Sequence, residues 1–473
     1  MLPLLLLIIL STLPVKANAA DLSLRPPLPL PGVTHVEGHL APFFHNQPIS
    51  AFRVYAFHND IPSPIPFQID ERDHRDRWIL THGPKAKQDT PANVFDANDV
   101  LLFMNRDLGE QGDPLVIPAA AQVWAEVQIG NSHTPLGFVY VGLFTPAAAP
   151  ALEEAPYARY DPPTDRIYAE RYALAFNAPL PTHFAPVEQI GDFGTNIISG
   201  IKVAAEVRLL GGLFTFQRTD ADLHSELRSY QPGPVRVLRQ ARYWVPLPLG
   251  LRTSGKVDLI FYRDFVEGSA LIKMKIPPRL VLADGELKTY FDFLNMSGAR
   301  LLLHGTSLSE PVNGAMTTAK RALDERPARW AALVLPTGRT ILLIPRLEGA
   351  LSKLDQRSYF FESTTQTAGG LPHFGFQFFE IKRLETGSHR LSVFGLLLDS
   401  TAPDDVQQAA QLFLSPPQVK VMKVMKVPQL DALLNQLPSR SSELLTLFTT
   451  SDGLRRARVA VEGTFVHTLD DCR

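Results

Sequence analysis

The stretch Gln122–Ile129, QVWAEVQI, places an aliphatic side chain at every second position. The aliphatic set is Val123, Ala125, Val127 and Ile129, and the intervening set is Gln122, Trp124, Glu126 and Gln128. A period of two is the repeat of a β-strand with one buried face. After a turn at Gly130–Pro135, the stretch Gly137–Phe144, GFVYVGLF, predicts a second strand that returns beside the first.

The chain keeps this character up to about residue 400. Forty prolines and thirty glycines interrupt strand-like runs, and amphipathic helical patterns are scarce. Lys256–Tyr262 and Ser269–Ile276 predict a hairpin closed by Arg263–Gly268. Further strand candidates are Lys288–Leu294, Trp330–Leu335, Arg339–Pro345, Phe374–Ile381 and Arg390–Leu398. We predict a mainly β protein with a small N-terminal β domain, a large two-sheet β-sandwich and a helix-containing C-terminal tail.

Changes in composition divide the chain into six segments. They are a removable secretory signal (1–19), a Pro-rich leader (20–32), the N-terminal β domain (33–144), an Ala/Pro linker (145–158), the large β-sandwich domain (159–400) and a C-terminal segment with short helices (401–473). Within the last segment, Pro403–Leu414 and Pro428–Phe448 have helical patterns. The run between them, Gln418–Val427 (QVKVMKVMKV), fits neither a regular strand nor a long helix.

The start of the chain indicates export. Met1–Pro14 is an apolar run, and Lys16 and an Ala17–Asn18–Ala19 cleavage site follow it. The run is shorter than the roughly 20 apolar residues of a membrane-spanning helix, so it predicts a secretory signal cut after Ala19. We expect an exported protein, periplasmic or extracellular, with no membrane span in the mature chain.

Charge and cysteine content exclude several classes of protein. The formal net charge of -2 argues against a nucleic-acid partner. The single cysteine, Cys472, excludes an intrachain disulfide, a zinc–thiolate site and an iron–sulfur cluster. The sequence also lacks a P-loop, a strand-linked G-x-G-x-x-G and a G-x-S-x-G motif.

Acidic residues crowd the segment Ile65–Gly109. The first group is Asp70, Glu71, Asp73 and Asp76, and the second is Asp96, Asn98, Asp99 and Asp107. The second group is our candidate metal site, because carboxylate and amide oxygens at alternate positions suit Ca²⁺. The alternative is structural, because Asp and Asn initiate turns and Arg72, Arg75, Arg77 and Arg106 are near enough in sequence to pair with these acids.

A second candidate site follows the turn in Gln231–Arg239, QPGPVRVLR. The candidate ligand-binding residues are Arg236, Arg239, Tyr243 and Trp244. Arginines and aromatic faces together can bind a sugar, and a guanidinium can hold a sugar carboxylate through two hydrogen bonds. The alternatives are a structural ion pair with Asp220, Asp222 or Glu226, and aromatic side chains in the core.

No spacing identifies catalytic residues. The histidines have no arrangement typical of a metal site. If the large domain is an enzyme, His224 or His304 with Glu226 or Asp264 are the acid–base candidates.

The motifs at Ile65–Asp73, Phe95–Gly109 and Gly233–Arg239 resemble a class of exported bacterial proteins, many of them uncharacterised. The later part resembles the large sandwich, or supersandwich, of galactose-mutarotase-like proteins and certain polysaccharide lyases, in which a G-P-V-R turn recurs. This resemblance implies a β-sandwich fold and, for an enzyme, a carbohydrate lyase or epimerase. It transfers no catalytic residue to this chain.

Two functions are therefore expected. The first is an exported carbohydrate-associated protein that binds or processes a glycan, with Ca²⁺ as a candidate ion. The alternative is a non-catalytic accessory subunit of a cell-envelope or extracellular complex. A glycan protein should present a groove on the large sandwich lined by Tyr243, Trp244 and charged side chains, whereas an accessory subunit should expose apolar surface.

Overall fold

The computed structural model describes residues 30–113, 116, 118, 120–130, 135–152, 155–209, 213–246, 252–274, 278–280, 282–294, 296–324, 326–363, 370–426, 445–450 and 453–460. This part of the chain is mainly β, as predicted, and its two α-helices are α1 (Thr318–Asp324) and α2 (Pro403–Leu414). Neither of these helices has the length and hydropathy of a membrane-spanning segment. The predicted secretory signal and most of the predicted leader lie outside the described residues.

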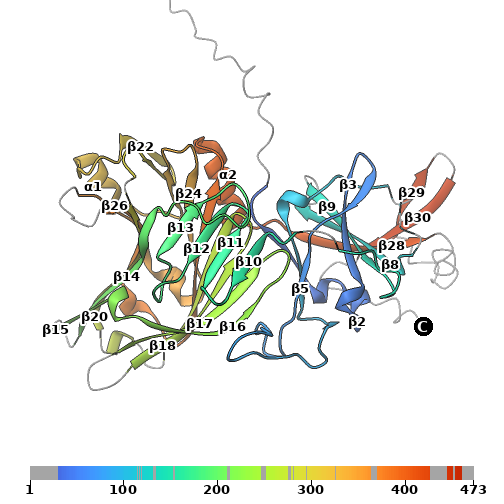
Figure 1. Ribbon diagram of the computed structural model, residues 1–473, viewed down its shortest axis with the longest axis horizontal. Helices are drawn as coiled ribbons and strands as arrows, with labels where there is room; N and C mark the ends of the chain where they lie inside the picture. The colour runs from blue at the N-terminus through green and yellow to red at the C-terminus, as the bar shows by residue number, and fades with distance from the viewer. Residues whose placement is uncertain are drawn as a thin grey trace, which may run out of the picture.

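Three sheets build the N-terminal domain (Figure 1). The largest has the order β29 (Leu445–Thr450), β30 (Gly453–Ala460), β28 (Val419–Lys426), β8 (Val123–Gly130), β9 (Pro135–Leu143), β3 (Phe52–His58) and β4 (Ile61–Pro64). The others are β1 (Val33–Glu37), β7 (Val100–Met104), β5 (Gln68–Asp70), and the pair β2 (Gln47–Pro48) and β6 (Val94–Phe95). A core that includes Val36, Leu101, Phe103, Val127 and Val141 lies between the first two sheets.

The predicted hairpin at Gln122–Phe144 is present as β8 and β9, which pair antiparallel with Val127 opposite Val139. The expectation that only one face of β8 is buried is wrong. Ala125, Val127 and Ile129 enter the core described above, but Trp124 and the fully buried Glu126 lie on the opposite face. That face is covered by a second aromatic cluster, and the Tyr140 hydroxyl donates a 2.6 Å hydrogen bond to Glu126.

The lysine- and valine-rich run of the C-terminal segment is a strand. It forms β28, which pairs antiparallel with β8 and places Val421 opposite Val127 (Figure 1). The predicted helix Pro403–Leu414 is confirmed as α2. The second predicted helix lies outside the described residues except at its end, where Leu445–Thr450 is strand β29 because it pairs with β30.

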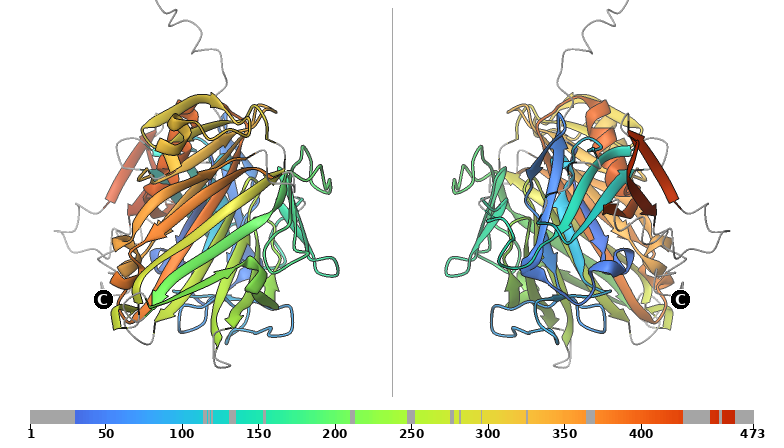
Figure 2. Two further views of the ribbon diagram at one scale, coloured as in Figure 1. Left: turned by 90° about the vertical axis from the view of Figure 1, so that its left-hand side faces the viewer. Right: turned by 90° about the vertical axis from the view of Figure 1, so that its right-hand side faces the viewer.

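The large domain is a sandwich with an additional small sheet (Figure 2). The five-stranded sheet has the order β15 (Phe214–Thr219), β14 (Ile198–Leu209), β20 (Leu282–Leu294), β26 (Gly370–Phe379) and β25 (Asp355–Phe361). The nine-stranded sheet has the order β16 (His224–Gln231), β17 (Val237–Pro246), β18 (Arg252–Phe261), β19 (Phe265–Met274), β27 (Gly387–Leu398), β24 (Thr340–Leu347), β23 (Ala331–Val334), β21 (Arg300–Leu303) and β22 (Thr306–Pro311). The small sheet consists of β10 (Ala158–Asp161), β11 (Arg166–Ala169), β12 (Tyr172–Ala175) and β13 (His183–Pro186).

Phe261, Phe293 and Phe376 belong to the core shared by these sheets. The predicted hairpin at Lys256–Ile276 corresponds to β18 and β19, but its loop is shorter than expected. Tyr262 donates its N–H to the Phe265 carbonyl at 3.0 Å, so strand β19 already begins at Phe265.

The outer face of the nine-stranded sheet joins the two domains. Leu238 and Ile260 on this face belong to a buried cluster with Leu102 of β7 and with Val406 and Ala409 of α2. Burying apolar surface on both sides of the boundary favours a fixed arrangement of the domains. This arrangement brings the N-terminal acidic segment close to β16, β17 and β18.

Candidate functional site

The buried carboxylate of Asp99 holds two parts of the acidic segment together through hydrogen bonds to their backbone. Its side chain is fully buried and accepts backbone N–H hydrogen bonds from Arg72 at 3.0 Å and from Asp96 at 2.9 Å. Asp96 in turn accepts the N–H of Asn98 at 3.0 Å. The Asn98 amide donates to the carbonyls of Arg72 and Asp73. These are the turn-forming roles that the sequence offered as the alternative to metal binding.

The same structural role holds for Asp73. Its carboxylate accepts backbone N–H bonds from Arg75 and Arg77 and a 2.8 Å bond from Arg77 Nε. The hydrogen bonds from the Arg77 side chain, followed by those from the two backbone N–H groups, hold the pKa of Asp73 well below its usual range. Asp73 is therefore ionised and fixes the turn that begins the loop.

This loop borders the largest cavity described, with a volume of about 900 Å³. The lining residues are His45, Asn46, Arg72, Asp73, His74, Ile79, Lys87, Gln88, Asp89, Thr90, Asp96, Ala97 and Asn98. Most of these residues are of polar types, with Ile79 and Ala97 as the apolar members, and His74, Lys87, Gln88 and Thr90 are exposed, so the cavity is open to solvent.

Three carboxylates lie close together beside this cavity; Asp89 and Asp96 line it, and the third, Asp99, is fully buried and does not. Asp89, Asp96 and Asp99 each have an oxygen within 4.8 Å of the other two. Burial raises the pKa of Asp99 to about 7, the N–H donors of Asp96 and Arg72 oppose this, and the charges of Asp96 and Glu71 add to it. A hard divalent cation would favour the ionised form of this group. The predicted calcium ligands Asp96, Asn98 and Asp99 are thus brought together, with Asp89 as an acid that the sequence did not single out.

Asp107 does not join them, and its inclusion in the predicted metal site is wrong. Strand β7 runs between Asp99 and Asp107, and a strand rises about 3.3 Å per residue, so the two acids lie at opposite ends of it. Asp107 instead accepts hydrogen bonds of 2.8 and 3.0 Å from the Tyr157 hydroxyl. Burial raises the pKa of Asp107 to about 6, while the hydrogen bond from Tyr157 and the charge of Arg106 lower it.

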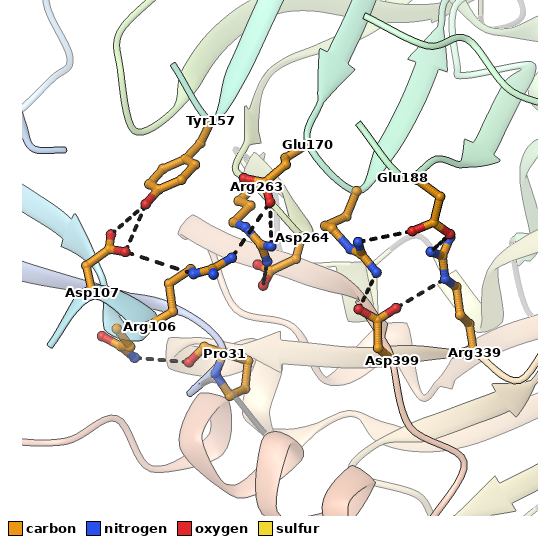
Figure 3. Close-up of polar contacts among 12 residues, drawn as sticks. Pro31, Arg106, Asp107, Tyr157, Glu170, Glu188, Arg263, Asp264, Arg339 and Asp399 are labelled. Atoms are coloured by element: carbon orange, nitrogen blue, oxygen red, sulfur yellow. Dashed lines mark hydrogen bonds and ion pairs between the residues drawn. The ribbon is translucent and has the colours of Figure 1, made fainter. Parts of the chain in front are cut away.

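Asp107 belongs to an ion network across the domain boundary (Figure 3). Arg106, its neighbour in η4 (Asn105–Asp107), lies 3.8 Å from Glu170, which Arg263 contacts at 2.6 Å. Arg263 also lies 3.4 Å from Asp264. Burial raises the pKa of Asp264, whereas the charges of Arg263 and Arg106 lower it. Asp264, a candidate acid or base, is therefore an ion-pair partner here.

A second group of charged side chains lies next to this network. Arg339 Nε lies 3.1 Å from Asp399, and Arg171 pairs with the same carboxylate and lies 3.4 Å from Glu188 (Figure 3). A small cavity of about 90 Å³ separates these ions from Asp264. Its size and its closely paired lining suit ordered water better than a ligand.

Arg236 is buried in an ion pair. Its Nε donates to Asp70 Oδ2 at 2.8 Å, and its Nη1 donates to the Tyr262 hydroxyl at 2.7 Å. The guanidinium lies over the Trp78 ring, 4.7 Å from its centroid. The structural alternative for Arg236 thus holds, but with Asp70 of the N-terminal domain rather than with Asp220, Asp222 or Glu226.

Arg239 is also an ion-pair residue. Arg236 precedes β17, whereas Arg239 lies within it and contacts Asp165 through Nε at 2.9 Å and Nη2 at 2.6 Å. Its guanidinium lies 4.0 Å from the Phe176 ring centroid. Residues 220, 222 and 226 are again not the partners; the partner is Asp165, which lies between β10 and β11 of the small sheet.

The two aromatic candidates point to opposite faces of β17. Tyr243 is buried and donates its hydroxyl to the Pro179 carbonyl at 2.9 Å. Trp244 stacks on His224 with ring centroids 5.4 Å apart. None of Arg236, Arg239, Tyr243 and Trp244 lines any of the three cavities described. None of these three cavities is therefore the predicted groove lined by Tyr243 and Trp244.

The acid–base candidates remain apart. His304 borders a third cavity of about 680 Å³ and meets Trp330 edge-on. Glu226 is exposed and lies 3.7 Å from Arg228 and 3.8 Å from Arg242. Among the described residues, neither His224 nor His304 hydrogen-bonds to Glu226 or Asp264, so the geometry assembles no general acid–base pair from them.

No protein-family model matches this chain, and no curated protein matches it. Among solved structures, the chain is similar to an alpha-mannosidase from Enterococcus faecalis V583, with 10% identity, a TM-score of 0.48, and coverage of 83% of this chain and 44% of the other. It is also similar to the alpha-N-acetylgalactosaminidase NagBb from Bifidobacterium bifidum, with 12% identity, a TM-score of 0.33, and coverage of 55% and 38%. A Glycoside Hydrolase Family 97 enzyme from Pseudoalteromonas sp. strain K8 has 9% identity, a TM-score of 0.26, and coverage of 51% and 36%.

The chain spans less than half the length of each of these three structures. TM-scores below 0.5 at such identities assign neither a family nor an activity. None of the three is described as a galactose-mutarotase-like protein or a polysaccharide lyase, so that resemblance stays a prediction.

Proposed function

We propose that the protein is an exported glycan-binding protein whose ligand occupies the 900 Å³ cavity beside the acidic loop. The composition of the cavity lining carries this proposal. Its amides, imidazoles and hydroxyl both donate and accept hydrogen bonds, which matches the hydroxyl groups of a sugar. Its volume lies within the roughly 300–1,000 Å³ range of small-molecule sites.

Binding is favoured over processing because the acids at the cavity are already engaged. Asp73 and Asp96, which line the cavity, and the buried Asp99 next to them accept hydrogen bonds from backbone N–H groups, and these bonds fix the loop. A general acid or base must instead reach the proton that it transfers. Asp89 and Gln88 are left to contact a ligand or, for Asp89, a cation. His45 Nε2 bonds to the Gly38 carbonyl at 3.0 Å and His74 Nε2 accepts from Arg75 Nε at 3.2 Å, so each histidine offers only its other ring nitrogen.

The test is thermal unfolding of the chain from Ala20 onward with neutral and acidic oligosaccharides. A ligand at about 100 times its dissociation constant stabilises the folded state by roughly 2.7 kcal/mol. Gln88→Ala should weaken binding, because Gln88 lines the cavity and is exposed. Gln122→Ala, which changes an exposed glutamine outside the cavity, is the matched control. Equal binding by both variants, or no shift with any sugar, would contradict the proposal.

A second candidate function is the accessory subunit. Leu213 and Phe214, at the start of β15, are 80% and 61% exposed, and adjacent exposed apolar side chains are typical of protein contacts. If this tip binds a protein, the double variant Leu213→Ser/Phe214→Ser should lose its partner in a native pull-down and keep glycan binding. An unchanged set of co-purifying proteins would remove this candidate.

A further inference from the structure

The loop between β5 and β6 is fixed against the edge of the nine-stranded sheet. His82 and Tyr230 exchange backbone hydrogen bonds of 3.2 and 3.0 Å, and their rings stack with centroids 5.2 Å apart. The Lys85 N–H donates to the Arg228 carbonyl at 2.8 Å. In Figure 1 this loop lies beside β16, at the lower border between the domains.

The loop and the sheet together form a group of cations. Lys256 of β18 is exposed, and desolvation followed by the charges of Arg228, Lys87 and Arg77 lowers its pKa, against a raising effect of Asp258. The strand register places Lys256 opposite Arg242 on the same sheet face. We call Arg77, Lys87, Arg228 and Lys256 the basic cluster.

Three members of the basic cluster have acidic neighbours, because the charge of Asp258 acts on Lys256 in addition to the two pairs below. Arg77 pairs with Asp73 at 2.5 Å. Arg228 Nη1 lies 3.7 Å from Glu226, a distance too long for a hydrogen bond, and Glu226 is shared with Arg242 at 3.8 Å. These carboxylates therefore offset only part of the positive charge.

Among the residues that the structure describes, the two lysines of the basic cluster have no carboxylate partner. Within the described ranges, Lys87 and Lys256 have no carboxylate within 4.0 Å, and the buried Nε of Arg228 has no hydrogen-bond partner. Holding like charges together raises the free energy of the folded protein, and an anion would offset that cost. The whole chain carries a net charge of -2, so this local excess is not part of a generally basic surface.

We propose that the basic cluster binds the anionic groups of an acidic glycan, carboxylate or sulfate, whose chain continues into the cavity. This inference rests on the proposed glycan function and names its substrate class. Lys87 connects the two places, because it lines the cavity and lies two residues after Lys85, whose N–H donates to the Arg228 carbonyl. Arg228 supplies a guanidinium charge, and the lysines supply mobile point charges.

The test is calorimetric titration of the chain from Ala20 onward with two matched pairs of oligosaccharides. Galacturonate oligomers are compared with their methyl esters, which keep the sugar and lose the charge. Sulfated dextran oligomers are compared with unsulfated dextran oligomers of equal length. We expect one acidic form to bind at least about tenfold more tightly than its neutral partner, and its affinity to fall as salt rises. The better pair identifies the anionic group as carboxylate or sulfate.

Variants then locate the contact. Lys256→Gln should weaken binding of the acidic oligomer about three- to fivefold, as expected for loss of one exposed ion pair, and Lys256→Glu by more. Lys382→Gln removes an exposed lysine outside the basic cluster and should have no effect. Lys256 does not line the cavity, so neutral-sugar binding should stay unchanged in both Lys256 variants.

The outcomes separate the two proposals. Equal affinity for acidic and neutral oligomers, or tight acidic binding that neither Lys256 variant changes, would overturn the basic cluster as the anion site and leave the cavity proposal standing. No binding by any of the four ligands would overturn both.

Discussion

The Arg236 guanidinium and the Asp70 carboxylate meet 2.8 Å apart across the boundary between the two domains, with side chains only 1% and 5% exposed. Removal of one partner from such a pair leaves a buried charge without compensation and costs about 3–5 kcal/mol. We therefore expect Asp70→Asn to lower the free energy of unfolding by several kcal/mol. Chemical denaturation measures this change. The exposed pair of Arg346 with Glu348 provides the control, because Glu348→Gln should change stability by less than about 1 kcal/mol. Similar losses in both variants would contradict the structural role of the Arg236 pair.

Asp107 should make stability depend on pH. Its pKa is raised from 3.8 to about 6, so the folded state binds a proton more tightly than the unfolded state. The stability that this group contributes is present below about pH 4 and is lost as the pH rises through 6. Asp107→Asn removes this dependence and keeps an oxygen that can accept from Tyr157.

The unfolding free energy of Asp107→Asn minus that of the wild type should therefore rise by about 2 kcal/mol between pH 4 and pH 7. Denaturation at several pH values measures this difference. Asp192→Asn, at an exposed position, should give a constant difference. A constant difference for Asp107→Asn as well would show that the carboxylate titrates normally.

The candidate calcium site is tested by adding Ca²⁺ and by removing it with EDTA. If Asp89, Asp96 and Asp99 hold Ca²⁺, the ion should raise the unfolding temperature and EDTA should reverse the rise. Binding should also release protons near pH 7, because the pKa of Asp99 is about 7 without the ion. Asp89→Asn should abolish the effect, whereas Asp107→Asn should keep it because Asp107 lies at the other end of β7. Identical melting curves with Ca²⁺ and with EDTA would leave these acids with their turn-forming roles alone.

Gly233 should not tolerate a side chain. A Cβ at this position would lie 2.1 Å from Gln68 Oε1, the atom that accepts the N–H groups of Val235 and Arg236. Gly233→Ala must displace Gln68 and should destabilise the protein by about 1–3 kcal/mol. Gly255→Ala is the matched control, because the nearest atom to its Cβ would be 3.4 Å away. Equal melting temperatures for the two variants would mean that the Gln68 contact adapts freely.

Local patterns predicted part of this fold. The alternation in Gln122–Ile129 predicted strand β8, and the proline and acids at Pro403–Leu414 predicted α2, because both signals lie within the element itself. The burial of Glu126 on the second face of β8 depends on an aromatic cluster from other strands. Strand β8 contributes only Trp124 to that cluster, so its own sequence does not indicate that both of its faces are covered.

The candidate sites were harder to predict than the strands, because they combine residues that are far apart in the sequence. Asp96, Asn98 and Asp99 are close in sequence and stay together, but Asp89 joins them only through the folding of the loop. Arg236 was expected to pair with acids near it in sequence, and the domain arrangement supplied Asp70 instead. The basic cluster combines a loop of one domain with strands of another, so no motif could have indicated it.

The pairing of β28 with β8 has a consequence for the order in which this protein is completed. As the polypeptide emerges from the ribosome or a translocation pore, β8 and β9 are available before the large domain, while the partner that covers the other edge of β8 follows that domain. Strand edges without a partner favour pairing with other chains. The open edge of β8 must therefore be kept from other molecules while the large domain is made, until Val419–Lys426 arrives.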